Sequence, residues 1–84
     1  MQLDNLDPTN TTHILAYVSE QLLDGNLACI TEVRTRGTDY YASRLLTALE
    51  DCIREGDLKT MLRQVAKDND LRLPLILKKE SSGS

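Results

Sequence analysis

Two stretches of this chain carry the same pattern of turn-forming residues and limit the fold more than any other feature. They read "LLDGNL" at 22–27 and "IREGDL" at 53–58, a displacement of 31 positions from 22 to 53. A glycine adopts the left-handed backbone that often ends a helix, and an Asn or Asp after it can cap the next helix. Each stretch therefore predicts a tight turn between two helices, either through duplication of a hairpin or through convergence on the same capping residues.

Apolar residues recur at helical spacing on both sides of each turn. The four helices are predicted to begin near Thr11, near Asn26, near Thr38 or Asp39, and near Asp57. Their predicted inward residues are Ile14, Leu15, Val18, Leu22, Leu27, Ile30, Val33, Tyr41, Ala42, Leu45, Leu46, Leu49, Cys52, Ile53, Leu58, Met61, Leu62 and Val65. This spacing is typical of amphipathic helices. We therefore expect an all-α fold of four short helices, arranged as two helical hairpins in a small bundle, with an aliphatic extended C-terminal segment.

The two ends of the chain lack the helical pattern. Residues 1–10 are expected to form an irregular lead-in, residues 11–77 a single helical domain, and residues 78–84 a disordered polar tail. The stretch "LRLPLIL" at 71–77 has a strand-like period, and Pro74 limits any strand there to an edge. Its aliphatic side chains either complete the domain's own core or contact a partner, the alternative that we favour: Leu71, Leu73, Leu75, Ile76 and Leu77.

The composition narrows the class of protein. The 84 residues carry a formal net charge of −3, so no overall positive charge attracts the chain to nucleic acid or anionic lipid. The start "MQLDNLDPTNTTH" has neither the positive charge nor the apolar run of a secretory signal, and no apolar run is long enough to span a bilayer. We therefore expect a cytoplasmic protein with no membrane contact, in which Cys29 and Cys52 are free thiols.

Residues for catalysis or metal binding are sparse. His13 is the single histidine, and its place among threonines at a helix start indicates a solvated residue. The acid pairs Glu50–Asp51 and Asp24–Glu55 could serve as general acid and base, but charged residues at helix ends are usually solvated. No zinc pattern, phosphate-binding glycine loop or nucleophile elbow occurs. We predict no catalytic residue, no cofactor and no metal; an enzyme would need a cleft that holds His13 with a carboxylate.

Two groups of basic residues are candidates for nucleic-acid binding. The first lies around the predicted turn in "EVRTRGTDYYASR" at 32–44 and comprises Arg34, Arg36 and Arg44, with Tyr40 and Tyr41 nearby. The second lies on the outer face of the fourth predicted helix and comprises Lys59, Arg63 and Lys67. Arginines and helix N-termini can bind phosphates. The alternative is that the bases compensate helix dipoles or face water, and that the tyrosines cover the core.

Parts of the chain resemble one family of small regulators. The stretch "ILAYVSEQLLDGNLACITEVRTRG" at 14–37 resembles the start of the HigA-like addiction-module antidotes, and "LTALEDCIREGDLKTMLRQVAKDND" at 46–70 is similar to the same pattern a second time. "DNDLRLPL" at 68–75 is similar to the segment that closes those antidotes. The family continues with a helix-turn-helix carrying a "GLSR" motif, whereas "GTDYYASRLLTALEDC" follows here at 37–52 without a second glycine turn. The resemblance implies a small cytoplasmic bacterial or phage regulator that works through contacts.

Together these observations predict a small non-enzymatic regulatory or adaptor protein that acts by protein–protein contacts, either antitoxin-like or as a transcriptional regulator. Its expected partners are a second copy of the chain, because a domain of this size buries only a modest core, and a toxin-like or regulatory protein. The alternative function is DNA binding through the two basic groups.

Overall fold

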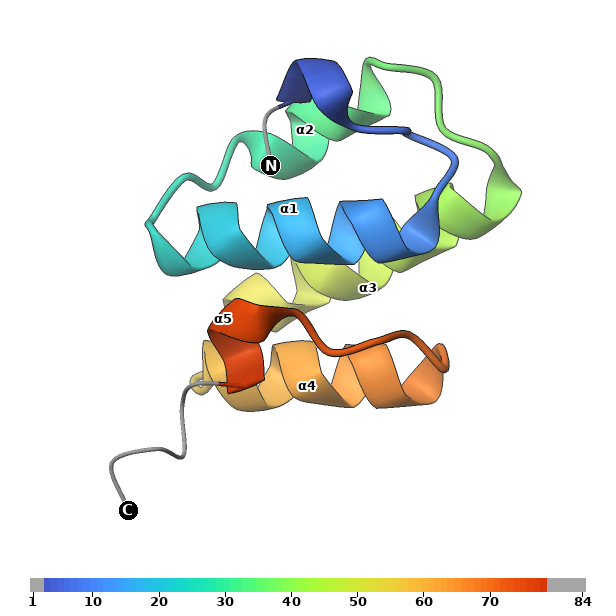
Figure 1. Ribbon diagram of the computed structural model, residues 1–84. Coiled ribbons are helices and arrows are strands. Elements are labelled where there is room, and N and C mark those ends of the chain that lie inside the picture. Colours follow the sequence, from blue (N-terminus) through green and yellow to red (C-terminus); the bar gives the residue numbers. More distant parts are fainter. Residues whose placement is uncertain (1–2, 79–84) are drawn as a thin grey trace.

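The computed structural model describes residues 3–78, and residues 1–2 and 79–84 lie outside the described part (Figure 1). In chain order the elements are a 3-10 helix η1 (Leu3–Asn5) and the α-helices α1 (Thr11–Leu23), α2 (Cys29–Arg34), α3 (Tyr40–Arg54), α4 (Leu58–Asp68) and α5 (Leu75–Lys78). Residues 3–78 contain no strand. The predicted all-α fold is confirmed. The predicted polar tail lies outside the described residues except for Lys78.

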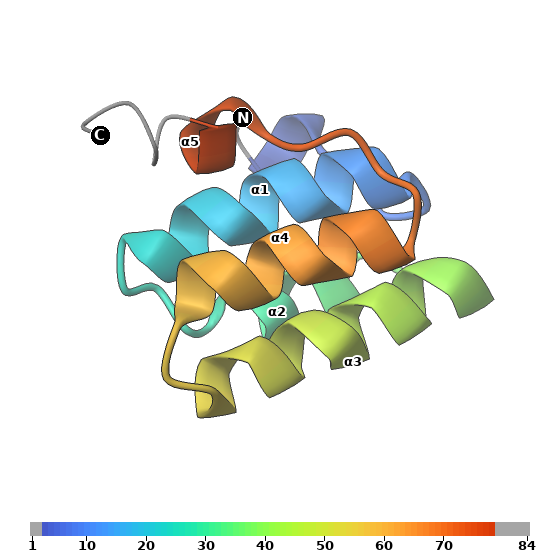
Figure 2. The same ribbon diagram turned by 90° about the horizontal axis from the view of Figure 1, so that it is seen from below.

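The three long helices α1, α3 and α4 form the body of the protein. Helices α1 and α3 run in the same direction and α4 runs the opposite way (Figure 2). The three helices pack against one another, and α2 packs against α1 and α3 on the side away from α4 (Figure 1). Helix α5 packs against α1 and α4. As a result, the starts of α1 and α3 meet the end of α4 at one end of the body.

The core is built almost entirely from aliphatic side chains. Its buried apolar residues are Leu6, Ile14, Leu15, Tyr17, Val18, Leu22, Cys29, Ile30, Val33, Ala42, Leu45, Leu46, Leu49, Cys52, Leu62, Val65, Ala66 and Leu77. Burying one large aliphatic side chain contributes about 1.5–3 kcal/mol. These buried residues include members of all four predicted apolar stripes, so the stripes meet in one core. Leu6, from the residues before α1, also belongs to this core.

Two of the predicted inward residues are exposed. Leu27 is 57% exposed because α2 begins only at Cys29, which leaves Leu27 in the turn before it. Tyr41 is 70% exposed because it lies in the first turn of α3, where that helix projects past its neighbours (Figure 2). Asn26 accepts a hydrogen bond from the N–H of Ala28 at 3.2 Å and so stabilises this turn, not the start of α2.

The two stretches with the same sequence pattern adopt different turns. Gly25 has a left-handed backbone with φ 91°, and the N–H of Asn26 donates to the carbonyl of Gln21 at 2.8 Å. This is the glycine-closed helix end that the sequence predicts. Gly56 does not have a positive φ; α3 ends at Arg54, and the next residue, Glu55, is already extended. The prediction that Gly56 closes its helix in the same way is wrong.

The C-terminal segment turns into a helix where the sequence predicts a strand-like period. Residues 71–74 have no regular structure, and α5 follows. The carbonyl of Pro74 accepts hydrogen bonds from the N–H groups of Leu77 and Lys78 at 3.0 and 3.2 Å. Pro74 lacks an N–H group and has a fixed φ, both of which suit the start of a helix. Ile76 and Leu77 therefore reach the core from one short helical turn, while Leu71 and Leu73 pack against it from the irregular stretch before that turn.

Candidate functional site

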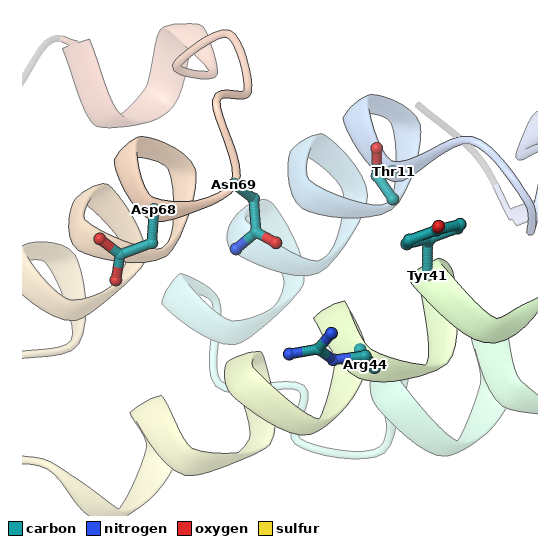
Figure 3. Close-up of a pocket in the computed structure, with 5 residues that line it drawn as sticks. All are labelled: Thr11, Tyr41, Arg44, Asp68 and Asn69. Atoms are coloured by element: carbon teal, nitrogen blue, oxygen red, sulfur yellow. The ribbon is translucent and has the colours of Figure 1, made fainter.

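The most complete candidate site is a polar notch at the end of the body where the starts of α1 and α3 meet the end of α4. Its volume is about 450 Å³, and its walls are formed by Thr11, Tyr41, Arg44, Asp68 and Asn69 (Figure 3). The guanidinium of Arg44 extends from α3 toward the end of α4, and the amide of Asn69 projects toward it from the opposite wall (Figure 3). Two helix starts and one helix end thus place polar groups around one space.

Side-chain caps position the two helix starts. Asp39 accepts a hydrogen bond from the N–H of Ala42 at 2.8 Å, which fixes the first turn of α3. Asn10 accepts one from the N–H of His13 at 3.1 Å and fixes the first turn of α1. Caps of this kind satisfy N–H groups that have no partner within the helix.

The end of α4 is held by a left-handed residue that is not glycine. Asp70 has φ 54°, and the N–H of Leu71 donates to the carbonyl of Ala66 at 2.8 Å. This pattern closes a helix sharply and redirects the chain. It holds Asp68 and Asn69 at the notch while the chain leaves toward α5.

Two tyrosines and an arginine form an exposed cluster at this end of the body. Tyr40 is 65% exposed, and its ring meets that of Tyr41 edge to face, with the ring centroids 5.3 Å apart. The guanidinium carbon of Arg44 lies 5.7 Å from the centroid of the Tyr40 ring, within cation–π range. The tyrosines therefore do not cover the core, which was the alternative reading of the sequence. We call these three residues the Tyr–Arg cluster.

The wall contributed by α4 presents hydrogen-bond acceptors. The carboxylate of Asp68 accepts one hydrogen bond, from the amide of Gln64 at 2.8 Å, and can accept more. The side-chain amide nitrogen of Asn69 donates to the carbonyl of Val65 at 2.9 Å. Its oxygen accepts from no residue within 3–78. The notch thus has a cationic donor on α3 and acceptors on α4.

Two of the predicted nucleic-acid-binding arginines are paired with acids. Arg34 lies 3.2 Å from a carboxylate oxygen of Glu50, and Arg36 lies 2.9 Å from a carboxylate oxygen of Asp4. Each guanidinium shares its charge with a carboxylate, which reduces the charge available to a phosphate. Arg44 is the member of this group that lines the notch.

The second predicted basic group lies along one face of α4, at intervals of four residues. Arg63 donates from Nε and Nη2 to the carbonyl of Leu77 at 3.4 and 3.2 Å, so it satisfies the end of α5. Lys59 and Lys67 form no ion pair with any residue of the described chain. This basic group lies beside α5. Asp68, the residue after Lys67, lines the notch.

The predicted partner-contact residues lie mostly within the domain. Leu77 is only 1% exposed and belongs to the core, while Leu71, Leu73 and Ile76 are half-buried against it. Leu75 is 68% exposed. Of the two alternatives for this segment, completion of the domain's own core describes all of these residues except Leu75.

None of the residues weighed as catalytic lines the notch. His13 is half-buried and does not line the notch, and its Nδ1 has no hydrogen-bond partner within residues 3–78. Glu50 is occupied by its ion pair with Arg34. In the same part of the chain, no three His, Cys, Asp or Glu side chains are grouped as metal ligands. No helix there has the length and hydropathy to cross a bilayer.

Both cysteines are buried, free thiols, as predicted. Burial raises the pKa of Cys29 to about 11 and, with the nearby carboxylate of Asp51, raises the pKa of Cys52. Since the thiolate is the nucleophile, a raised pKa lowers the reactivity of both thiols. Their role is to fill the core.

Two of the five residues that line the notch could be anticipated from the sequence. Tyr41 and Arg44 were singled out by type, whereas Thr11, Asp68 and Asn69 were missed. The sequence contained one signal for Asp68 and Asn69, the predicted hairpin of the third and fourth helices. Antiparallel packing of these two helices brings the end of the fourth to the start of the third. That α1 starts at the same end depends on the packing between the hairpins.

Comparison with protein-family models, curated proteins and solved structures finds no match.

Proposed function

We propose that this protein is a small non-enzymatic regulatory adaptor that works by binding another protein, as the resemblance to HigA-like antidotes implies. The observation that carries the proposal is the exposed Tyr–Arg cluster beside the notch. Tyrosine and arginine are enriched among the residues that dominate protein–protein binding energy. Their clustering on a helix start, with no role in the core, fits a recognition surface.

The geometry of the cluster supports this role. An edge-to-face ring pair beside a stacked guanidinium is partly ordered before binding, which lowers the entropy lost when a partner docks. Each ring also offers both an apolar face and a hydroxyl group, so it can bind a mixed surface. Most other large apolar side chains of residues 3–78 pack in or against the core, and only Leu27 and Leu75 among them are strongly exposed.

The experiment is affinity capture from the cells that express the protein, with quantitative mass spectrometry. The bait is the full chain, compared with a Tyr40→Ser/Tyr41→Ser variant and with Leu27→Ser, at another exposed position, as the matched control. We expect the same specific proteins on the wild type and the control, reduced at least tenfold on the tyrosine variant. Both variants change exposed residues, so circular dichroism should show them folded. Equal capture by all three baits would contradict the proposal.

A second candidate function is DNA binding, supported by the stripe of Lys59, Arg63 and Lys67 on α4. It is the weaker candidate because Arg34 and Arg36 are paired with acids and the chain has a net charge of −3. Such binding would weaken steeply with salt. A mobility shift at low salt that disappears in a Lys59→Gln/Lys67→Gln variant would support this alternative, and the absence of any shift would remove it.

A further inference from the structure

We propose that the notch binds one acidic side chain of a partner polypeptide. Arg44 binds the carboxylate, and the opposite wall of the notch binds the peptide N–H groups next to it. This inference rests on the proposed adaptor function and identifies the chemistry that the partner must present. The partner segment carries a single Asp or Glu between apolar residues, which contact the rings of Tyr40 and Tyr41.

The guanidinium of Arg44 is available for a carboxylate. No acid within residues 3–78 forms an ion pair with it, in contrast to Arg34 and Arg36, and its side chain is exposed. The Tyr40 ring lies 5.7 Å from the guanidinium carbon, which restrains the side chain and leaves N–H groups directed into the notch (Figure 3). A planar guanidinium presented in this way binds a carboxylate through two parallel hydrogen bonds.

The wall formed by α4 selects for a polypeptide. Asp68 and the side-chain oxygen of Asn69 are acceptors, so the ligand must bring donors as well as a negative charge. A peptide supplies backbone N–H groups beside its carboxylate. A phosphate or a nucleic-acid backbone brings more negative charge than one carboxylate and no N–H group beside it, so the carboxylate of Asp68 repels it more strongly.

Size and net charge restrict the ligand further. The volume of about 450 Å³ suits one side chain with the adjoining backbone, near the lower end of the range for binding pockets. The chain itself has a net charge of −3, so a strongly acidic segment would be repelled from a distance. A segment with one acid and apolar neighbours meets both conditions.

The test is a nuclear magnetic resonance titration of the full chain with two capped tripeptides. One has a glutamate between two leucines, and the other has glutamine in its place. We expect the glutamate peptide to bind at least about tenfold more tightly, because the hydrogen bonds from a guanidinium to a carboxylate are charge-assisted on both sides and those to a neutral amide are not. The shifts should concentrate on the Arg44 Nε–H and on the Asn69 amide.

Two variants separate this site from a general effect of charge. Arg44→Gln should reduce the preference for the glutamate peptide to about onefold. Arg54→Gln removes the same charge from the last turn of α3, far along the helix from the notch, and should keep the preference. Equal affinity for the two peptides, or a preference that survives Arg44→Gln, would overturn the inference. Tighter binding of inorganic phosphate than of the glutamate peptide would also overturn it.

The two proposals fail separately. If the peptide preference is absent while capture still depends on the tyrosines, the adaptor function stands and the notch is not its carboxylate site. If the preference is present but capture is independent of the tyrosines, the notch binds carboxylates and the proposed adaptor function fails.

Discussion

Substituting alanine at the two glycines of the repeated pattern should have opposite effects on stability. Gly25 has φ 91°, whereas Gly56 does not have a positive φ. A β-carbon added at either position meets no atom within 4 Å, so crowding does not enter the comparison. The two substitutions therefore differ only in the backbone conformation that alanine must adopt.

The magnitudes follow from two opposing effects. Alanine restricts the unfolded chain more than glycine, which stabilises the folded state by about 0.4–1 kcal/mol where the backbone allows it. The left-handed conformation costs an L-residue about 1–2 kcal/mol. Gly56→Ala should therefore raise the free energy of unfolding by about 0.4–1 kcal/mol, and Gly25→Ala should lower it by up to about 1.5 kcal/mol. The difference between the variants equals the left-handed cost, about 1–2 kcal/mol.

The assay is urea denaturation followed by circular dichroism at the helical band, together with thermal melts. A difference of about 1 kcal/mol corresponds to roughly 4–8 °C in Tm for a domain of this size. The slope of unfolding free energy against urea should be the same in all three proteins, which would show that only stability changed. If both alanine variants shift in the same direction by the same amount, the two turns share one conformation and the account of them given above is wrong.

Three further predictions concern the core. Leu77→Ala should lower the free energy of unfolding by about 2–5 kcal/mol by leaving a cavity, and Leu75→Ala by less than about 0.5 kcal/mol; equal effects in urea denaturation would contradict the packing of α5. Ser19 is fully buried and its hydroxyl has no hydrogen-bond partner within residues 3–78, so Ser19→Ala should raise the free energy of unfolding by about 1–2 kcal/mol. Ser43→Ala, at a half-buried position on α3, is the control for the higher helix propensity of alanine. A lower free energy of unfolding in Ser19→Ala would show that the Ser19 hydroxyl is hydrogen-bonded. Cys29 keeps its proton to a pKa of about 11 when folded and loses it near 9 when unfolded, so stability should fall between pH 9 and 11, and less so in Cys29→Ala.

Local sequence was sufficient for the helices and for most of the core. The stripes of α1, α3 and α4 could be read directly, because the residues that face a neighbour recur with the period of the helix. Leu46 and Leu62, for example, are both fully buried as their spacing predicts. The prediction that Tyr41 faces inward was wrong. Its spacing fits the apolar stripe, but it lies where α3 extends past the helices that would cover it.

Turn conformation was less predictable, because the same residues suit more than one backbone. Gly25 and Gly56 have nearly the same neighbours in sequence, and only Gly25 is left-handed. Conversely, Asp70 is left-handed without being glycine. Asp and Asn adopt this conformation more readily than most residues, but the neighbouring Asp68 and Asn69 are equally suitable by type. At Asp70 the left-handed backbone accompanies the hydrogen bond from the N–H of Leu71 to the carbonyl of Ala66, which residue types alone do not reveal.

By itself, the sequence determined that this protein is an all-α domain with an aliphatic core, because helical periodicity is a property of neighbouring residues. The tertiary structure decided which polar groups meet. Arg34 and Arg36 were equivalent to Arg44 as candidates, but packing gave the first two carboxylate partners from distant parts of the chain and left Arg44 facing the notch. Whether a charge is paired depends on residues brought together by folding, and that information lies in the arrangement of the helices, not in any one of them.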